Sequence, residues 1–128
     1  MIPEATLVLI VDDSDRNRKL AGEVLRFVGL RTIEAATAAD GIALAAEHLP
    51  DVILMDLRLP DLDGAKAVGI LRAEPRTSRI PVVAMTASPL GDEEEWLVAA
   101  GFAGQIAKPF DIDTFPDLVM GFAARGTD

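Results

Sequence analysis

Five residues of this chain combine side chains that could carry chemistry with positions at the ends of short apolar segments. Asp12 and Asp13 follow the first such segment, and Asp56 follows the third. Thr86 and Lys108 stand after the fourth and the fifth. In an open parallel sheet, functional residues gather at the carboxyl ends of the strands. If these segments are strands of one sheet, three carboxylates, a hydroxyl and an ammonium group meet at one edge.

The charges of these groups indicate a cation site that can also accept an anion. Carboxylates this close together repel one another unless they are protonated or bridged by a cation. Mg²⁺ suits a small site of a few carboxylates plus water, and Lys108 would neutralise the remaining charge. Such a pocket can bind a phosphoryl group, with Asp56 as its nucleophile and Thr86 offering a hydroxyl to a phosphoryl oxygen. We therefore expect Mg²⁺-dependent phosphoryl transfer to Asp56.

The elements that must position these groups follow from an alternation of short apolar and longer amphipathic segments. This is the pattern of βα units around a parallel sheet. We predict an α/β fold, a doubly wound (βα)5 arrangement with a five-stranded parallel sheet. The first, third and fourth segments are continuously apolar, as expected for strands covered on both faces. The predicted strands span Leu7 to Val11, Arg31 to Ala35, Asp51 to Met55, Ile80 to Met85 and Gly104 to Ala107.

Five helices are predicted between and after these strands. Ser14 or Asp15 can cap the first, and Gly29 can end it in a left-handed conformation. Asp63 can cap the third, and the acids from Asp92 suit the positive end of the fourth. The second is expected over Ala38 to Leu49, the third runs to Ala73, and the fifth begins near Asp113. The residues expected to face inward are Leu20, Ala21, Val24, Leu25 and Val28 in the first helix, Ile42, Ala45, Ala46 and Leu49 in the second, and Phe115, Leu118, Val119 and Phe122 in the fifth.

Composition restricts the class of protein. The chain has 128 residues, half of them hydrophobic, and its 12 basic and 21 acidic residues give a formal net charge of -9. This length fits one domain, which we expect to span residues 1–128. The negative charge repels phosphate backbones, so nucleic-acid binding is not expected. The chain has no cysteine, which excludes disulfides and thiol chemistry, and no segment suits a signal peptide or membrane span. We expect a cytoplasmic protein.

Four motifs of the chain resemble those of a known family. The segments LVLIVDD, LMDLRLPDLDG, VVAMTA and AKPF are similar to the motifs of receiver domains of bacterial two-component response regulators, and they occur in the same order. Each motif ends a predicted strand, and the resemblance covers residues 6–124. It implies a flavodoxin-like fold and a single-domain regulator similar to the chemotaxis regulators. Together the four motifs are specific, although each alone would be weak.

The resemblance also implies a role for each acidic residue of the site. Asp56 matches the phosphoacceptor of the family. Asp12 and Asp13 match the acidic pair that holds Mg²⁺, with Asp13 as a direct ligand and Asp12 acting through water. The backbone carbonyl of Arg58 matches the third protein ligand of the ion.

Two further matches complete the implied site. Thr86 matches the switch hydroxyl, and Lys108 matches the ion-pair partner of the phosphoryl group. The bond between Lys108 and Pro109 matches a cis peptide that would aim the lysine into the pocket. Two other acids near the site, Asp61 and Asp63, are expected to be only loop and helix-cap residues.

The chain departs from the family pattern at the position three residues before the lysine. Gln105 stands there in place of the usual switch aromatic, so a rotamer change of an aromatic ring cannot report phosphorylation. We expect activation to show instead in residues 86–91 and in the fourth helix. Arg58 and Ser88 occupy variable positions that tune dephosphorylation in this family, and their combination predicts no lifetime.

The expected function is that of a signalling phosphoacceptor and not of an enzyme acting on external substrates. A histidine kinase or a histidine phosphotransfer protein would donate the phosphoryl group. The output would be a changed affinity for a downstream protein at the surface of the fourth helix, fifth strand and fifth helix. The chain could be a stand-alone regulator or a fragment of a larger regulator or hybrid kinase. A phosphatase would need an acid where Arg58 stands, and a flavodoxin-like flavin binder would meet repulsion from Asp12 and Asp13.

Overall fold

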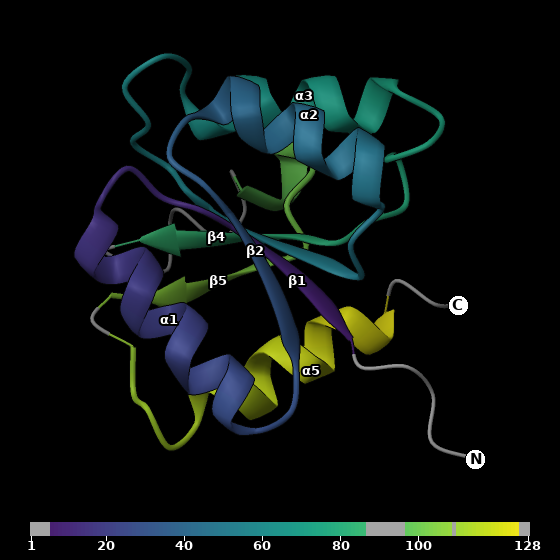
Figure 1. Cartoon of the computed structure of the whole chain (residues 1–128). Coiled ribbons are helices and arrows are strands. Elements are labelled where there is room, and N and C mark those ends of the chain that lie inside the picture. Colours follow the sequence, from purple (N-terminus) through teal and green to yellow (C-terminus); the bar gives the residue numbers. More distant parts are fainter. Residues whose placement is uncertain (1–5, 87–96, 109, 126–128) are drawn as a thin grey trace.

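The computed structural model of the chain describes residues 6–86, 97–108 and 110–125. Five parallel strands form one sheet in the order β2-β1-β3-β4-β5 (Figure 1), which confirms the predicted fold. No helix of this described part is long and apolar enough to cross a membrane. The strands are β1 (Leu7–Val11), β2 (Arg31–Ala35), β3 (Val52–Asp56), β4 (Val82–Thr86) and β5 (Gly104–Ala107). The helices are α1 (Asp15–Phe27), α2 (Ala38–His48), α3 (Gly64–Ala73) and α5 (Phe115–Arg125).

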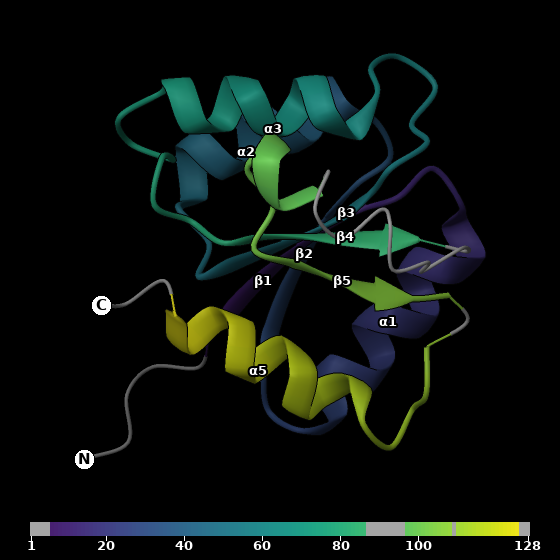
Figure 2. The ribbon, with the colours of Figure 1, turned by 180° about the vertical axis from the view of Figure 1, so that it is seen from behind.

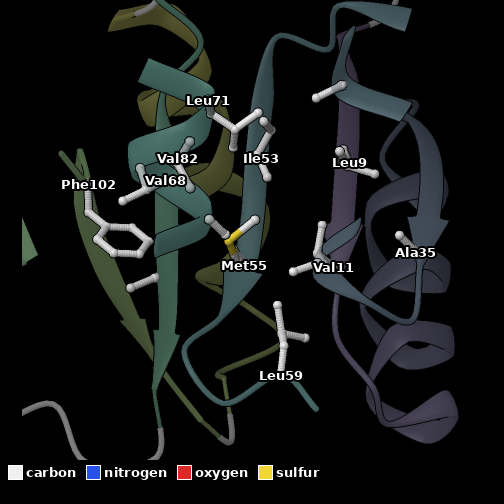
Figure 3. Packing of buried hydrophobic residues seen from close by; sticks show 14 of the residues in the cluster. Leu9, Val11, Ala35, Ile53, Met55, Leu59, Val68, Leu71, Val82 and Phe102 are labelled. Carbon is white, nitrogen blue, oxygen red and sulfur yellow. The ribbon is translucent and has the colours of Figure 1, made fainter. Parts of the chain in front are cut away.

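Helices cover both faces of the sheet and bury its apolar side chains in two clusters. Figures 1 and 2 show α2 and α3 on one face, with α1 and α5 on the other. Because side chains alternate along a strand, β1 sends Leu9 and Val11 to the first face and Val8 and Ile10 to the second. Figure 3 shows Leu9 and Val11 in the first cluster together with Met55 of β3. The centre of the sheet is therefore fully buried between the two layers of helices.

Three of the five strands have the predicted bounds, and two are shifted towards the site. β3 begins at Val52 instead of Asp51, and β4 begins at Val82 instead of Ile80. Pro81 has no N–H to donate, so the ladder of β4 starts after it. The shifts make Asp56 and Thr86 the last residues of their own strands. The sheet itself thereby positions both of these predicted site residues.

The inward faces of α1 and α5 are narrower than predicted. Ala21 and Leu25 of α1 are buried, whereas Leu20 is 42% exposed. In α5, Val119 is buried and Leu118 is 46% exposed. Successive helix residues lie about 100° apart around the helix axis. The side chain next to a residue that faces the sheet can therefore point towards solvent, as those of Leu20 and Leu118 do. Val28 and Leu49 are also exposed, since they stand at the caps of α1 and α2 and not within the helices.

Most of the predicted helix ends are confirmed. The side chains of Ser14 and Asp63 accept hydrogen bonds from backbone N–H groups at the start of α1 and α3. Gly29 after α1 has a φ of 95°, which suits glycine. The start of the predicted fourth helix at Asp92 lies outside the described residues, and residues 97–100 are helical.

Asp61, in the loop between β3 and α3, binds the first turn of α2. Its Oδ1 accepts a hydrogen bond from the Ala38 N–H at 2.9 Å, and its Oδ2 accepts one from the Ala39 N–H at 3.0 Å. These donors favour the charged carboxylate and hold the pKa of Asp61 below its usual value. The loop that leaves the site after β3 is therefore tied to a helix on one face of the sheet.

Replacement of Asp61 by alanine should lower the thermal midpoint at neutral pH, because two N–H groups of α2 lose their acceptor. A carboxyl group with a depressed pKa stabilises the fold above its unfolded pKa. Its contribution is lost as the pH falls below about 4 and through the lower folded pKa. The difference in midpoint between wild type and Asp61→Ala should thus shrink in acid, as thermal unfolding followed by circular dichroism would show. Asp40→Ala removes the same charge from the exposed first turn of α2 and should have a smaller effect; equal effects would contradict this role of Asp61.

Candidate functional site

The carboxyl edge of the sheet brings together the five residues that the sequence singled out. Asp12 and Asp13 follow β1, Asp56 and Thr86 end β3 and β4, and Lys108 follows β5. The parallel register pairs Asp56 with Met85 and Thr86 with Ala107, so these strands end nearly level. Because β3 lies between β1 and β4, Asp56 stands between the acidic pair and Thr86.

Three carboxylates form a tight acidic group at this edge. One oxygen from each of Asp12, Asp13 and Asp56 lies within 4.8 Å of the others. Asp12 is buried, Asp56 is half-buried and Asp13 is exposed. The sheet thus holds three negative charges close together, with one of them open to solvent.

Lys108 is the cation that bridges two of these acids. Its Nζ lies 2.9 Å from Asp12 Oδ2 and 2.9 Å from Asp56 Oδ2. Burial opposes the charged ammonium group, but the hydrogen bonds and attraction of Asp56 and Asp12 outweigh this and raise the pKa of Lys108. The lysine is therefore firmly protonated near neutral pH. Its backbone N–H also donates to Thr86 O at 2.8 Å, which fixes the start of its segment.

Backbone donors hold the other oxygens of the two bridged acids. Asp12 Oδ1 accepts a hydrogen bond from the Ser14 N–H at 2.9 Å, and Asp56 Oδ1 accepts one from the Arg58 N–H at 2.9 Å. The carboxylate of Asp13 has no hydrogen bond or ion pair with the described residues. Two acids are consequently fixed in direction, whereas the third is available to an ion from solvent.

The donor set fits a hard divalent cation. With one ammonium group against three carboxylates, the group formed by Asp12, Asp13, Asp56 and Lys108 keeps two negative charges. Carboxylate oxygens are the ligands that Mg²⁺ prefers, and the ion keeps several waters of its own. The charge and the chemistry of these residues therefore match Mg²⁺.

Other predictions about the surroundings of the site have mixed outcomes. Asp61 and Asp63 act as loop and cap residues, as predicted. Pro109, Ser88 and most of the segment 86–91 lie outside the described residues, so the cis peptide and the activation loop stay predictions. The Oε1 atom of Gln105 is buried and has no hydrogen-bond partner among the described residues, which the sequence did not reveal.

Sequence reasoning also missed Arg18, which contacts the turn that carries the acidic pair. An Nη atom of its guanidinium group donates to the backbone oxygen of Asp12 at 2.7 Å. The only signal was its spacing of three residues from Asp15, which puts both on one face of α1. That spacing predicts an ion pair within the helix but not a contact with the preceding turn.

Comparison with known proteins assigns the family. Residues 8–120 match the family model described as the response regulator receiver domain. The chain belongs to this family. It is 32% identical over 115 residues to the polar-differentiation response regulator DivK of Brucella ovis, covering 90% of this chain and 94% of that protein. As a phosphoacceptor of two-component signalling, a receiver domain is a switch and not a classical enzyme, which removes the phosphatase and flavin-binding alternatives.

Solved receiver structures agree with the fold. A response regulator structure from Chloroflexus aurantiacus has a TM-score of 0.87 and 28% identity, and covers 94% of this chain and 98% of that one. The receiver domain of the sensor histidine kinase PA1611 from Pseudomonas aeruginosa has a TM-score of 0.84 and 31% identity, with the same coverage. That receiver holds a magnesium ion coordinated in its active-site cleft.

Replacement of Lys108 by alanine should destabilise the metal-free receiver by roughly 2 kcal/mol, because Asp12 and Asp56 would lose their common cation. The variant has a more negative site, so millimolar Mg²⁺ should raise its thermal midpoint by more than it raises that of the wild type. Thermal unfolding with and without MgCl₂ measures both effects. Lys66→Ala, which removes an exposed lysine of α3, is the matched control. The charge argument fails if Mg²⁺ shifts all three proteins equally.

Proposed function

We propose that Asp56 is the phosphoacceptor of this receiver domain and that Asp12, Asp13, Asp56 and the backbone carbonyl of Arg58 hold the Mg²⁺ ion. The observation that carries the proposal is the group of three carboxylates within 4.8 Å, bridged by Lys108. When bound, Mg²⁺ supplies positive charge that offsets the negative oxygens of a phosphoryl group. The site of the PA1611 receiver supports this choice of ion.

The position of Asp56 in the sheet distinguishes it from the other two acids. β3 lies between β1 and β4, so a phosphoryl group on Asp56 would have the acidic pair on one side and Thr86 on the other. Asp12 is the most buried of the three, and Asp13 lies outermost. In the transfer, an oxygen of Asp56 forms a bond to phosphorus while the bond from phosphorus to the donor breaks.

Lys108 and Thr86 would act on the phosphoryl group after transfer. Lys108 already binds Asp56 Oδ2 at 2.9 Å and would pair with the new anionic oxygens. Thr86 ends the neighbouring strand and would donate its hydroxyl to one of them. Movement of Thr86 towards the phosphoryl group would transmit the modification to the segment that follows β4.

The proposed partners follow from the family. Receiver domains have histidine kinases and histidine phosphotransfer proteins as partners, and one of these would supply the phosphoryl group here. A downstream protein would bind at the surface of the fourth helix, β5 and α5. We further propose that residues 1–128 form one receiver domain, which the match over 8–120 and the single sheet support. A location in the cytoplasm is also proposed, and membership of the receiver family supports it.

Incubation with acetyl phosphate and Mg²⁺ should add one phosphoryl group, as measured by intact mass. Asp56→Asn keeps the shape of the side chain and an acceptor for the Arg58 N–H, but it removes the nucleophile, so its label should fall to background. Asp13→Ala should raise the Mg²⁺ concentration needed for labelling by more than about tenfold, the size typical for loss of an outer contact, because it removes a proposed direct ligand. Asp40→Asn removes an exposed acid outside the site and should be labelled like the wild type. Labelling of Asp56→Asn at the wild-type level would assign the phosphoacceptor elsewhere.

A further inference from the structure

Arg18 lies on α1 with its guanidinium group turned back towards the end of β1. Its side chain is only 15% exposed, although arginine is usually a surface residue. One Nη atom donates to the backbone oxygen of Asp12 at 2.7 Å. A second contact pairs the guanidinium group with the carboxylate of Asp15 in the first turn of the same helix. Arg18 thus joins the beginning of α1 to the peptide between the two acids of the site.

The carboxylate of Glu34 on β2, the strand beside β1, helps to hold the Arg18 side chain in this position. Glu34 of β2 has its Oε1 3.5 Å from Nε of Arg18 and its Oε2 3.9 Å from an Nη atom of Arg26. Gly22 of α1 leaves room for this arrangement, because a Cβ there would lie 3.3 Å from Glu34 Oε2 and 2.8 Å from an Nη atom of Arg26. Glycine inside a helix is otherwise unfavourable. The packing of α1 against β2 therefore accommodates these ion pairs.

The contact with the Asp12 oxygen matters most for Asp13. A peptide unit is planar, so the carbonyl oxygen of Asp12 and the Cα of Asp13 move together. The carboxylate of Asp13 has no hydrogen bond or ion pair with a described residue that could fix its position. Its direction towards the other two acids consequently depends on the orientation of this peptide.

We propose that Arg18 is a positioning residue of the cation site, which orients the peptide between Asp12 and Asp13 so that the carboxylate of Asp13 meets those of Asp12 and Asp56. The inference rests on the proposed function, since it assumes that these acids bind Mg²⁺. Arg18 does not contact the ion in this scheme. It acts only through the backbone oxygen of Asp12.

Electrostatics and positioning predict opposite results for the loss of Arg18. Removal of a positive charge near a cation site strengthens Mg²⁺ binding if charge alone counts. Loss of the contact with the Asp12 oxygen weakens binding, because Asp13 is released. The sign of the change in the dissociation constant therefore decides between the two effects.

The experiment is a titration of the ¹⁵N-labelled full chain with MgCl₂ at constant ionic strength, followed by amide chemical shifts well below the thermal midpoint. Arg18→Ala should raise the Kd for Mg²⁺ about tenfold, the size usual for the loss of an outer contact to a metal ligand. Arg18→Lys keeps a donor without the planar fork and should give an intermediate Kd; it also serves if Arg18→Ala does not fold.

Two controls separate positioning from charge and from general stability. Arg16→Ala removes an exposed positive charge from the same helix. Arg26→Ala removes a positive charge that also pairs with Glu34, but Arg26 has no hydrogen bond or ion pair with the turn after β1 among the described residues. Both should leave the Kd unchanged or lower it, even if Arg26→Ala reduces the thermal midpoint.

Each outcome has a defined meaning. If Arg18→Ala binds Mg²⁺ as tightly as the wild type or more tightly, the positioning role is wrong and the proposed function is unaffected. If Arg26→Ala raises the Kd as much as Arg18→Ala does, the effect comes from α1 packing and the inference is also wrong. A wild-type protein that binds no Mg²⁺ would overturn the proposed cation site and this inference together.

Discussion

The repulsion among three carboxylates at the edge of the sheet is the constraint on which the rest of the structure depends. Asp12, Asp13 and Asp56 would separate if their backbone were free, since like charges within 4.8 Å repel strongly in a partly desolvated site. Lys108 offsets part of this repulsion by bridging two of the acids. The negative charge that remains attracts a divalent cation to this edge.

The packed core of the sheet keeps the three carboxylates together against their mutual repulsion. Every residue of β1 is buried, and β3 and β4 place apolar side chains in both clusters. A shift of one strand by one residue would move each of its apolar side chains to the opposite face of the sheet. The packing of both clusters would then be lost, so the register is strongly specified. The last residues of β3 and β4 are therefore fixed in register, and Asp56 and Thr86 are fixed with them. Hydrogen bonds outside the sheet then hold the loops that begin at this edge. Asp61 accepts one from the start of α2, and Arg18 donates one to the turn after β1.

How much of this could be predicted depends on the length of the pattern that encodes each feature. The strands and the meeting of the five site residues were predictable, because continuous apolar segments each end at a polar residue. The exposed sides of Leu20 and Leu118 were not, because a helix periodicity does not show how wide a face the sheet covers. Contacts between distant residues, such as Arg18 with Glu34, have no local signal. Gln105 was recognised as a departure from the family. The burial of its Oε1, which has no hydrogen-bond partner within the part of the chain that the structure describes, depends on neighbours that no sequence spacing specifies.

The balance of charge also determines which events can change the state of the site. The raised pKa of Lys108 means that its favourable contribution is complete below its unfolded pKa, and is lost only when the pH rises through the higher folded value. Near neutral pH the lysine therefore keeps its proton, and its charge does not respond to small changes in acidity. A cation or a phosphoryl group, in contrast, changes the charge of the site by binding to it. The three carboxylates attract the cation and repel the phosphoryl group, whereas Lys108 does the opposite. The charge of Lys108 is therefore constant near neutral pH, and it is available to offset the negative charge of the groups at this edge.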